Sequence, residues 1–308
     1  MPNTISIIIV TYNAMPWLKR CLDSTLGYEV VVVDNASQDE TVAFIKKHYP
    51  KISLFEQTEN LGFGRANNIG ISYALQQGAE AVFLLNQDAY LVEDALEKLI
   101  QVSAEHPDYG VLSPIHTNGD GTSLDANFAL YASHQNNANF YSDFVLNQEK
   151  KAVYEVPFVN AAGWLVSKKC LQTVGGFDPL FFHYGEDDNY CQRVHYHGLK
   201  VGIVKDSLLI HDREFRLEKD IKFGSAIYFK DQMRHHKYLG ANINKEDDDL
   251  LSKASKKYLK STLKSMLKFS FKNAQIYYKE YRLIKKLIPE VAQSRIQNRI
   301  VGPNYLER

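Results

Sequence analysis

The chain has 308 residues, of which 45% are hydrophobic and 23% charged, and its formal net charge at pH 7 is +0. A chain of this length buries a full core and exceeds a typical single domain, so we expect one large domain with an appendage. No apolar run reaches the roughly 20 residues of a membrane span, and the apolar segment at 5–10 lacks the cationic lead of a signal peptide. The three cysteines show no metal-ligand spacing and are expected to be reduced thiols of a cytosolic protein.

The balanced total charge hides an asymmetry between the body and the tail of the chain. Residues 251–308 contain 14 Lys and Arg against 3 Asp and Glu, whereas residues 1–250 contain 22 against 33. A basic tail on an acidic body suggests an anionic partner, either a membrane surface or nucleic acid. The plainer alternative is a solvated helical face.

Short runs of β-branched residues alternate with helical patterns along the first half. Strands are expected at 5–10, 29–33, 52–55, 81–85 and 109–113, and helices near 16–26, 39–48, 64–77 and 92–105. Strands that are apolar throughout and separated by helices indicate a parallel sheet covered on both faces. The fold class is therefore α/β, with ligands expected beyond the carboxyl ends of the strands.

The pattern changes in the second half. Residues 115–155 are rich in Asn, Ser, Gly and aromatics, which suits a long functional loop or a small inserted hairpin. Regular structure resumes at 156–167. We place the main domain at 1–240 and a basic helical extension at 241–308. In the extension, apolar residues recur at helical spacing among lysines: Leu259, Leu263, Met266 and Leu267.

Polar clusters follow the expected strands. The first, "TYNAMPWL" (11–18), lacks the glycine-rich turn of a dinucleotide-binding enzyme. In "VVVDNASQDET" (31–41), Ser37 and Glu40 match the S-x-x-E capping box that begins a helix. Asp34 ends the strand, where its carboxylate suits either a hydrogen bond from a nucleotide base or an Asx-turn.

Two further stretches combine glycines or acids with an expected helix start. In "NLGFGRANNIG" (60–70), the glycines permit close backbone approach and the polar run suits a nucleotide, although turns before helices often look like this. In "GGFDPLFFHYGEDDNYCQR" (175–193), Glu186, Asp187 and Asp188 stand together. Crowding in a cleft would raise the pKa of one carboxyl, as a general base requires; N-terminal capping is the alternative.

The order of these stretches resembles family 2 inverting nucleotide-sugar glycosyltransferases over about residues 4–215. The matching segments are "IIIVTYN", "VVVDNASQDET", "NLGFGRANN", "LLNQDAY" and "GGFDPLFFHYGED", followed by a late His. The resemblance implies the GT-A fold, a mostly parallel sheet flanked by helices, with residues 115–155 on the acceptor side. It also implies the branch that includes rhamnosyltransferases of bacterial surface polysaccharide synthesis.

The resemblance assigns four roles. Asp34 contacts the base, Asp88 holds a divalent metal against the diphosphate, Asp187 is the catalytic base and His211 completes the metal ligands. The implied cofactor is Mn²⁺ or Mg²⁺, and a His ligand favours Mn²⁺. From the residues alone, a lone His at the end of the apolar run 204–212 is more often structural.

Two residues depart from the family pattern. Asn86 replaces the first acid of the metal-binding motif, and Asn189 replaces the second acid of the usual "EDxDL". Whether Asp187 or Asp188 faces the acceptor therefore stays open, and motif alignment favours Asp187. The complete expected site comprises catalytic Asp187 and Glu186; nucleotide-binding Thr11, Tyr12, Asn13, Asp34, Asn60, Gly62, Arg65, Asn67 and Asn86; metal-binding Asp88 and His211; and, toward the acceptor or sugar, Trp164 and Asp188.

We therefore expect an inverting glycosyltransferase that moves a sugar from a dTDP-, UDP- or GDP-linked donor to a hydroxyl of a glycan or lipid-linked acceptor. The expected location is the cytoplasm, with the basic tail at the inner face of the membrane or in a homo-oligomer, and no nucleic acid partner. One alternative is a non-catalytic sugar-nucleotide-binding module, which Asn86 and Asn189 favour. A nucleotidyltransferase would show a glycine- and basic-rich loop after the first strand, and "TYNAMPWL" is not such a loop.

Overall fold

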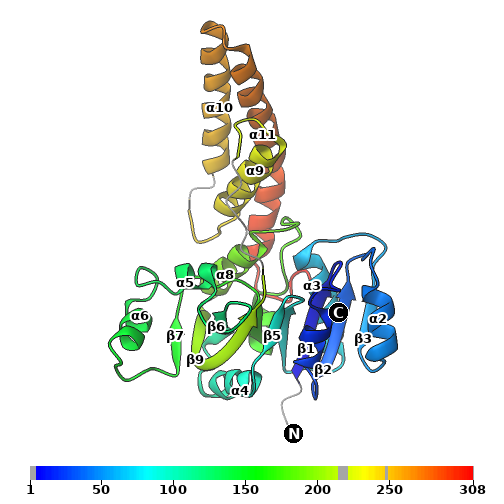
Figure 1. Ribbon diagram of the computed structural model, residues 1–308. Helices are drawn as coiled ribbons and strands as arrows, with labels where there is room; N and C mark the ends of the chain where they lie inside the picture. Colours follow the sequence, from blue (N-terminus) through cyan, green and yellow to red (C-terminus); the bar gives the residue numbers. More distant parts are fainter. Residues whose placement is uncertain (1–4, 214–220, 247–248, 308) are drawn as a thin grey trace. The chain divides into compact units, whose positions relative to one another are not determined.

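The computed structural model describes residues 5–213, 221–246 and 249–307, and the chain forms two compact units (Figure 1). The first unit comprises residues 1–214 together with 301–308, and the second comprises residues 215–300. The boundary predicted at residue 240 differs from this division. Helix α9 (Ala226–Gly240) packs with the tail helices, and the last residues return to the first unit.

The first unit is built on one mixed sheet, and the N-terminal half of that sheet confirms the expected strands. Its strands are β1 (Ile5–Thr11), β2 (Glu29–Asp34), β3 (Ser53–Glu56) and β4 (Ala81–Asn86). They pair in parallel in the spatial order β3-β2-β1-β4. β1 and β4 are almost wholly buried because helices cover both faces of a sheet of this kind.

The other half of the sheet contains the antiparallel pairs. Its strands are β5 (Ala89–Leu91), β6 (Tyr109–Thr117), β7 (Val153–Glu155), β8 (Gly163–Ser167) and β9 (Lys200–His211). From β4 the order continues β8-β6-β9-β5, and β7 pairs with β9. β6 and β9 run parallel, whereas β8 is antiparallel to both of its neighbours. The short β5 brings the chain after β4 alongside the end of β9.

Helices cover both faces of the sheet, as expected. Successive residues of a strand point to opposite faces: Ile7 and Ile9 share a buried cluster with residues of α1 (Leu18–Asp23), α2 (Thr41–His48) and α4 (Ala95–Glu105). On the other face, Ile8 and Leu84 share a cluster with residues of α3 (Phe63–Gln76), α7 (Lys168–Thr173) and α8 (Glu186–Tyr196). The result is a three-layer α/β unit.

The segment at 115–155 is partly helical rather than a long loop, and of the predicted hairpin it shows one antiparallel bridge, between Thr117 and Leu124. After the end of β6 it forms two short helices, α5 (Ala126–Tyr131) and α6 (Ala138–Val145). The side chains of Asp125 and Asn137 cap their first turns by accepting the N–H of Phe128 and Phe140, respectively. Both phenylalanines are buried in the core, so the segment is anchored although its composition is typical of a loop.

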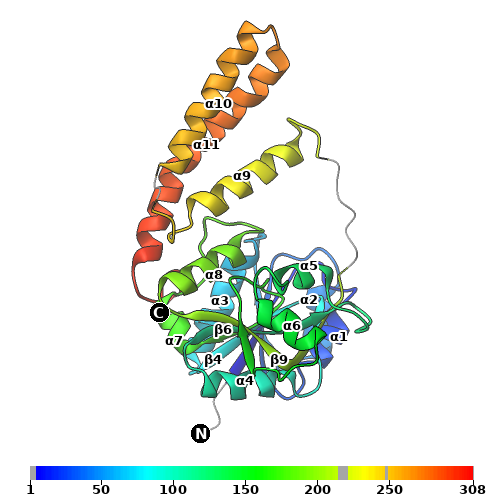
Figure 2. The same cartoon turned by 90° about the vertical axis from the view of Figure 1, so that its left-hand side faces the viewer.

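The second unit is helical, which confirms the helical character predicted for the tail. It contains α9, α10 (Leu250–Leu267) and α11 (Phe271–Arg299), and α10 and α11 form an antiparallel hairpin (Figure 2). The Arg295 guanidinium donates hydrogen bonds to the carbonyls of Gly240, Asn242 and Lys245 at 3.0, 2.7 and 2.7 Å, which ties the end of α9 to α11. Within the described residues, no helix combines the length and apolar character needed to cross a bilayer.

The last residues of the chain lie against the first unit. The Gly302 N–H donates to the Thr173 carbonyl at 3.0 Å, and the Asn304 carbonyl accepts from the Gly176 N–H at 2.7 Å. Leu306 packs against the buried cluster of α3 and α8. The terminal segment therefore supports the turn that leads into α8.

Candidate active site

The carboxyl ends of three neighbouring strands meet at one edge of the sheet. In the strand register, Thr11 of β1 lies beside Asp34 of β2, and Val10 of β1 lies beside Asn86 of β4. Ligands of open α/β sheets bind at this edge. The structure thus brings together three of the polar residues that we predicted from the ends of separate strands.

The Asp34 carboxylate is already engaged by neighbouring groups of the protein. Its Oδ1 accepts hydrogen bonds from Thr11 Oγ1 at 2.8 Å and Ser37 Oγ at 2.6 Å, and its Oδ2 accepts from the Ser37 N–H at 2.9 Å. Only 2% of Asp34 is exposed. Of the two roles considered for Asp34, the turn is observed, and the contact with a nucleotide base stays a prediction.

The capping box predicted for Ser37 and Glu40 is wrong. α2 begins at Thr41, and no side-chain hydrogen bond caps it at Glu40. The Ser37 hydroxyl instead donates to Asp34 and accepts from the N–H of Asn13 at 2.9 Å. The S-x-x-E motif takes no account of Asp34, three residues before Ser37, whose carboxylate competes for the Ser37 hydroxyl. The motif therefore predicted a capping box that does not form.

Gln87, to which the sequence analysis gave no role, holds the loop that follows β1. Its side-chain amide accepts from the Tyr12 N–H at 2.7 Å and donates to the Tyr12 carbonyl at 3.2 Å. This pair continues the β1–β4 pairing beyond the strand ends. The side chain of Asn13 accepts from the Gln38 N–H at 2.8 Å. Tyr12 is 45% exposed, so its ring is accessible to a ligand at this edge.

The glycines before α3 allow close approach of protein rather than of a ligand. Gly62 has φ 81°, and a Cβ there would lie 2.0 Å from the Phe182 carbonyl oxygen; one at Gly64 would lie 2.7 Å from Phe177 Cβ. Asn60 accepts from the Gly62 N–H at 2.9 Å, which fixes the turn. The start of α3, at Gly62 and Gly64, therefore packs directly against the segment that precedes α8, at Phe177 and Phe182.

The polar residues of α3 divide between buried and exposed positions. Asn67 is 1% exposed and donates to the Phe63 carbonyl at 3.0 Å within the helix. The contact of Asn67 with a nucleotide, like that of the similarly buried Asp34, stays a prediction. Arg65 is exposed, with a 3.4 Å hydrogen bond to the Pro179 carbonyl, so its guanidinium is accessible to an anionic ligand.

Asp88 and His211, the two expected metal ligands, lie side by side. Ala89 of β5 pairs with His211 of β9, and the Asp88 carbonyl accepts from the Asp212 N–H at 2.7 Å. As a result, His211 Nε2 lies 3.6 Å from Asp88 Oδ1. This separation is too long for a hydrogen bond and suits two ligands of one cation. The described residues contain no cluster of three or more His, Cys, Asp or Glu arranged to hold a metal.

A buried group behind His211 was missed by the sequence analysis. Asp125 Oδ2 lies 3.7 Å from His211 Nδ1, and Asp125 also accepts from Arg213 Nε at 2.8 Å. Burial raises the pKa of Asp125, but the bonds from Arg213 and the Phe128 N–H outweigh it, so the pKa is lowered overall. An ionised carboxylate behind an imidazole orients the ring and increases its basicity as a ligand. In the sequence, Arg213 directly after "IHD" indicates that an acidic partner lies near His211. Nothing in the sequence around Asp125 identifies it as that partner.

His116 completes this buried group in an uncharged state. Burial, followed by the neighbouring His211, lowers the pKa of His116 to about 3. Its ring lies 6.0 Å from the ring of His211, and its Nε2 lies 3.0 Å from Ser113 Oγ. His116 is thus a neutral packing partner for His211 at physiological pH.

The acidic cluster occupies the first turn of α8, as predicted. Burial, with further contributions from Asp187 and Asp188, raises the pKa of Glu186 to about 8, and Glu186 is 5% exposed. Burial also raises the pKa of Asp187, although its carboxylate accepts the Asp188 N–H at 2.9 Å. Asp187 and Asp188 are partly exposed, whereas Asn189 is 1% exposed. The site therefore contains a buried carboxyl that stays protonated near pH 7 beside a more accessible one.

Tyr131, at the end of α5, is influenced by charges of both the acidic turn and the group behind His211. Burial raises its pKa to about 12, and the charges of Asp187 and Arg213 act on it, followed by those of Asp188 and Asp125. Tyr131 is therefore a neutral side chain in the electrostatic field of both groups. Nothing in the sequence distinguishes it from the other tyrosines of the chain.

Trp164 was expected near the acceptor and is instead part of the core. It is 0% exposed, and its ring stacks on Phe177 at 6.3 Å and tilts against Tyr190 at 5.8 Å. A direct contact with an acceptor is therefore contradicted. An aromatic residue in the apolar strand β8 packs inward for the same reason as its aliphatic neighbours.

Comparison with known proteins decides the family. The model of "Glycosyl transferase family 2" matches residues 6–174, which is more than half of the chain. The chain belongs to glycosyl transferase family 2. The resemblance inferred from the motifs is confirmed, and with it the interpretation of this family 2 protein as a glycosyltransferase.

Relatives among known proteins include rhamnosyltransferases. A dTDP-rhamnosyl transferase, RfbF, of Shigella flexneri is 27% identical over 216 residues, which covers 68% of this chain and 70% of the relative. An N-acetylglucosaminyl-diphospho-decaprenol L-rhamnosyltransferase of Mycobacterium tuberculosis is 24% identical over 244 residues, 71% of this chain and 80% of the relative. The expected rhamnosyltransferase-like branch is thus supported for this family 2 chain.

Solved structures confirm the GT-A fold. A mannosyltransferase of Pyrobaculum calidifontis, solved with GDP-Man and Mn²⁺, aligns with a TM-score of 0.52 at 20% identity and covers 96% of this chain and 86% of its own. TarS residues 1–349 of S. aureus align with a TM-score of 0.52 at 16% identity, covering 91% of each chain. At these identities the likeness concerns the fold of the family 2 protein alone.

Proposed function

We propose that this family 2 protein transfers a sugar, with inversion, from a nucleoside diphosphate to a hydroxyl of a glycan or lipid-linked acceptor. The observation that carries the proposal is the pair Asp88 and His211, 3.6 Å apart beside the carboxyl edge of the sheet. The same unit presents the carboxyl groups of Glu186, Asp187 and Asp188 in the first turn of α8. A transfer from diphosphate to hydroxyl requires both a site for the diphosphate and a candidate base.

The donor binds at the carboxyl edge of the sheet. Asp34, held by Thr11 and Ser37, is placed to receive the base, and the exposed ring of Tyr12 offers a surface on which the base stacks. Arg65 lies exposed near the same edge as a partner for phosphate. The rhamnosyltransferase relatives favour a dTDP-linked deoxysugar as the donor.

Asp88 and His211 would hold a divalent cation, and their donor set fits one. A carboxylate and an imidazole 3.6 Å apart leave room for diphosphate oxygens and water, and Mg²⁺ or Mn²⁺ commonly bind with few protein ligands plus substrate phosphates. Asp125, which Arg213 holds, lies 3.7 Å behind His211 Nδ1 and supplies negative charge on that side of the ring. When bound, the cation supplies positive charge beside the leaving diphosphate.

Asp187 acts as the general base. Its carboxylate takes the proton of the acceptor hydroxyl, the acceptor oxygen bonds to the anomeric carbon, and the bond from that carbon to the diphosphate breaks on the opposite face. The nucleoside diphosphate leaves with the bonding electron pair. Glu186, protonated at neutral pH, donates a hydrogen bond rather than accepting the proton. Because burial raises the pKa of Asp187, the rate is expected to rise with pH as this carboxyl ionises.

A nucleotide screen tests the donor and the activity separately. Thermal unfolding is measured with dTDP, UDP and GDP, each with Mn²⁺ or with a chelator. A nucleotide at 100 times its Kd adds about 2.7 kcal/mol of stability. The proposal expects stabilisation by one nucleotide that is lost with the chelator, and slow hydrolysis of the matching sugar nucleotide. Stabilisation without hydrolysis or transfer would favour the non-catalytic binding module, and no stabilisation by any nucleotide would refute the donor site.

A further inference from the structure

The helix α10 leaves the large apolar side chains of its second half exposed, whereas α11 buries several of its own, among them Ile284 and Leu287. The buried positions of α10 are Leu251, Ser255 and Thr262, two of which carry hydroxyls. Both hydroxyls are satisfied within the helix, by the carbonyls of Ser252 and Tyr258 at 2.9 Å each. If α10 served internal packing alone, Leu263 and Leu267 would be expected among its buried positions, yet they are 56% and 82% exposed. The outward apolar residues therefore call for a different explanation.

Exposed apolar side chains gather toward the end of the hairpin where α10 turns into α11. The turn is tight, with Phe269 at φ 55°. At least half of each of these side chains is exposed, and the exposed fraction is largest at the turn: Leu263 56%, Met266 50%, Leu267 82%, Phe269 82% and Phe271 59%. We name this set, with Leu259 at 36% exposure, the apolar tip. Isolated exposed apolar residues are ordinary, but a contiguous group of this size marks an interaction surface.

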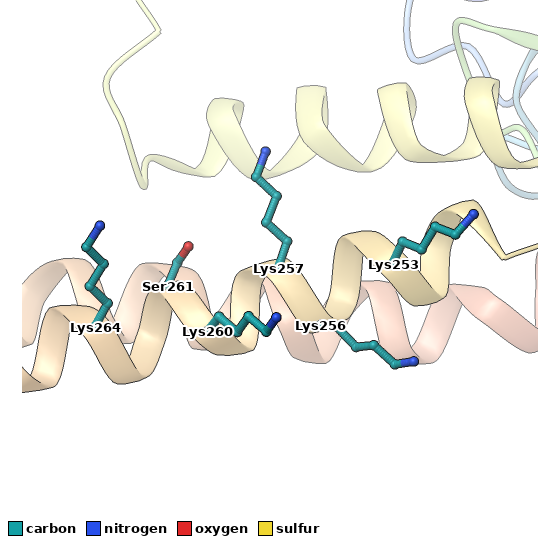
Figure 3. Close-up of a pocket in the computed structure, with 6 residues that line it drawn as sticks. All are labelled: Lys253, Lys256, Lys257, Lys260, Ser261 and Lys264. Atoms are coloured by element: carbon teal, nitrogen blue, oxygen red, sulfur yellow. The ribbon is translucent and has the colours of Figure 1, made fainter.

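Lysines line α10 on the approach to the apolar tip. Residues 250–279 contain eight Lys and no Asp, Glu or Arg. Five of these lysines line a shallow groove on α10 together with Ser261 (Figure 3): Lys253, Lys256, Lys257, Lys260 and Lys264. In the close-up, Lys257, Ser261 and Lys264 point to the same side of the helix. The long aliphatic stem of Lys lets its ammonium stay in water while the neighbouring apolar surface is buried.

We propose that this face of the hairpin docks on an anionic lipid bilayer. The apolar tip enters the boundary between headgroups and acyl chains, and the lysines bind the lipid phosphates. Binding to an anionic bilayer requires both apolar and cationic side chains, and the hairpin presents both. A nucleic acid would use the lysines but leave Phe269 and Leu267 without a role. A two-fold pairing with a second copy would bring two faces of the same positive charge together.

Vesicle co-sedimentation of the full chain tests the proposal. Binding is expected to vesicles that contain phosphatidylglycerol, to be absent from pure phosphatidylcholine, and to fall at high salt because surface charges are screened. Each lysine near an anionic surface contributes about a fivefold factor in binding, so the Lys260→Gln/Lys264→Gln variant is expected to bind on the order of 25-fold more weakly. Lys285→Gln/Lys286→Gln, exposed on α11 but outside the acid-free stretch, is the matched control and should bind like the wild type.

The apolar contribution is tested by a second pair of variants. Leu267→Gln/Phe269→Gln is expected to lower binding at least tenfold, whereas Ile296→Gln, with 58% exposure elsewhere on α11, is expected to change it less than twofold. Because these side chains are exposed, the thermal unfolding midpoint is expected to stay unchanged. A Phe269→Trp variant should be quenched by brominated lipids, and an Ile296→Trp variant should not.

Three results would overturn the proposal. The first is equal binding to neutral and anionic vesicles, or none to either at low salt. The second is tighter binding to RNA or DNA that depends on Lys260 and Lys264 but not on Phe269, which would identify a nucleic acid surface. The third is a dimer that Leu267→Gln/Phe269→Gln converts to a monomer. The proposal does not rest on the proposed transfer reaction, because the variants leave Asp88, His211 and the acidic turn of α8 intact.

Discussion

Replacing Glu186 by Gln distinguishes the role of this buried carboxyl group from that of the proposed catalytic base, Asp187. With a pKa of about 8, Glu186 is roughly 90% protonated at pH 7, and Gln resembles that protonated form in shape and in its ability to donate a hydrogen bond. The Glu186→Gln variant is therefore expected to lose less than about tenfold in kcat/KM at pH 7, below about 1.4 kcal/mol. Asp187→Asn is expected to lose on the order of 10²–10⁴-fold.

The same substitution has a consequence for stability whose sign follows from the raised pKa. The folded state holds the Glu186 proton more tightly than the unfolded chain, where the carboxyl titrates near 4.5. Stability is therefore lost as the pH rises from about 4.5 to about 8, by up to about 5 kcal/mol. Glu186→Gln removes this loss, so above pH 8 the variant is expected to unfold at a higher temperature than the wild type.

Two assays check the reasoning independently. Release of nucleoside diphosphate in the presence of acceptor gives kcat/KM across pH 6 to 9 for both variants, and thermal unfolding across the same range gives the stability. If Glu186→Gln loses as much activity as Asp187→Asn, Glu186 is the base and the assignment of Asp187 is wrong. If the unfolding midpoint of Glu186→Gln shows the same dependence on pH as the wild type, the pKa of Glu186 is not raised.

Three further substitutions probe the groups around this centre. Asp88→Ala should abolish the gain in nucleoside diphosphate affinity that Mn²⁺ provides; equal affinities by isothermal titration calorimetry in variant and wild type would refute the metal assignment. Asp125→Asn should weaken Mn²⁺ binding about 10–100-fold by loosening His211, and unchanged binding in the same titration would show that Asp125 only caps α5. Arg295→Met should destabilise the second unit by about 3–5 kcal/mol, because three carbonyls lose a charged donor; a thermal unfolding midpoint like that of the wild type would contradict this.

The parallel half of the sheet was predictable because its strands carry their own signal. Runs such as "ISIIIV" and "EVVVV" are apolar throughout, which only a strand covered on both faces requires, and β1 and β2 lie where expected. The acids that follow strands or open helices were predictable for a related reason. Asp88 and Glu186 interrupt apolar or aromatic runs, and a carboxylate at such a place is costly unless it has a function or a partner.

The remaining parts of the site depended on tertiary contacts that leave no local trace. Asp125 reaches Arg213 across 88 positions of sequence, and no periodicity links them. Trp164 misled because it was assigned to the acceptor although it lies in the apolar strand β8, most of whose residues are buried. The boundary was predicted at 240 because the segment after it is hydrophilic. The buried residues Phe229 and His236, which join α9 to the tail helices, are separated by mainly polar residues along the helix and form no apolar run in the sequence.

The return of residues 301–307 to the first unit makes the helical unit an insertion with two covalent attachments. A truncation at residue 250 would remove more than the hairpin, since it would also take away the Asn304 contacts that support the Gly175–Gly176 turn and the Tyr305 ring beside Arg193. Loss of activity in such a truncated protein would say nothing about the hairpin. An excision that joins residue 214 to residue 301 through a flexible linker keeps those contacts, and closing such a loop costs little additional entropy as the linker is lengthened.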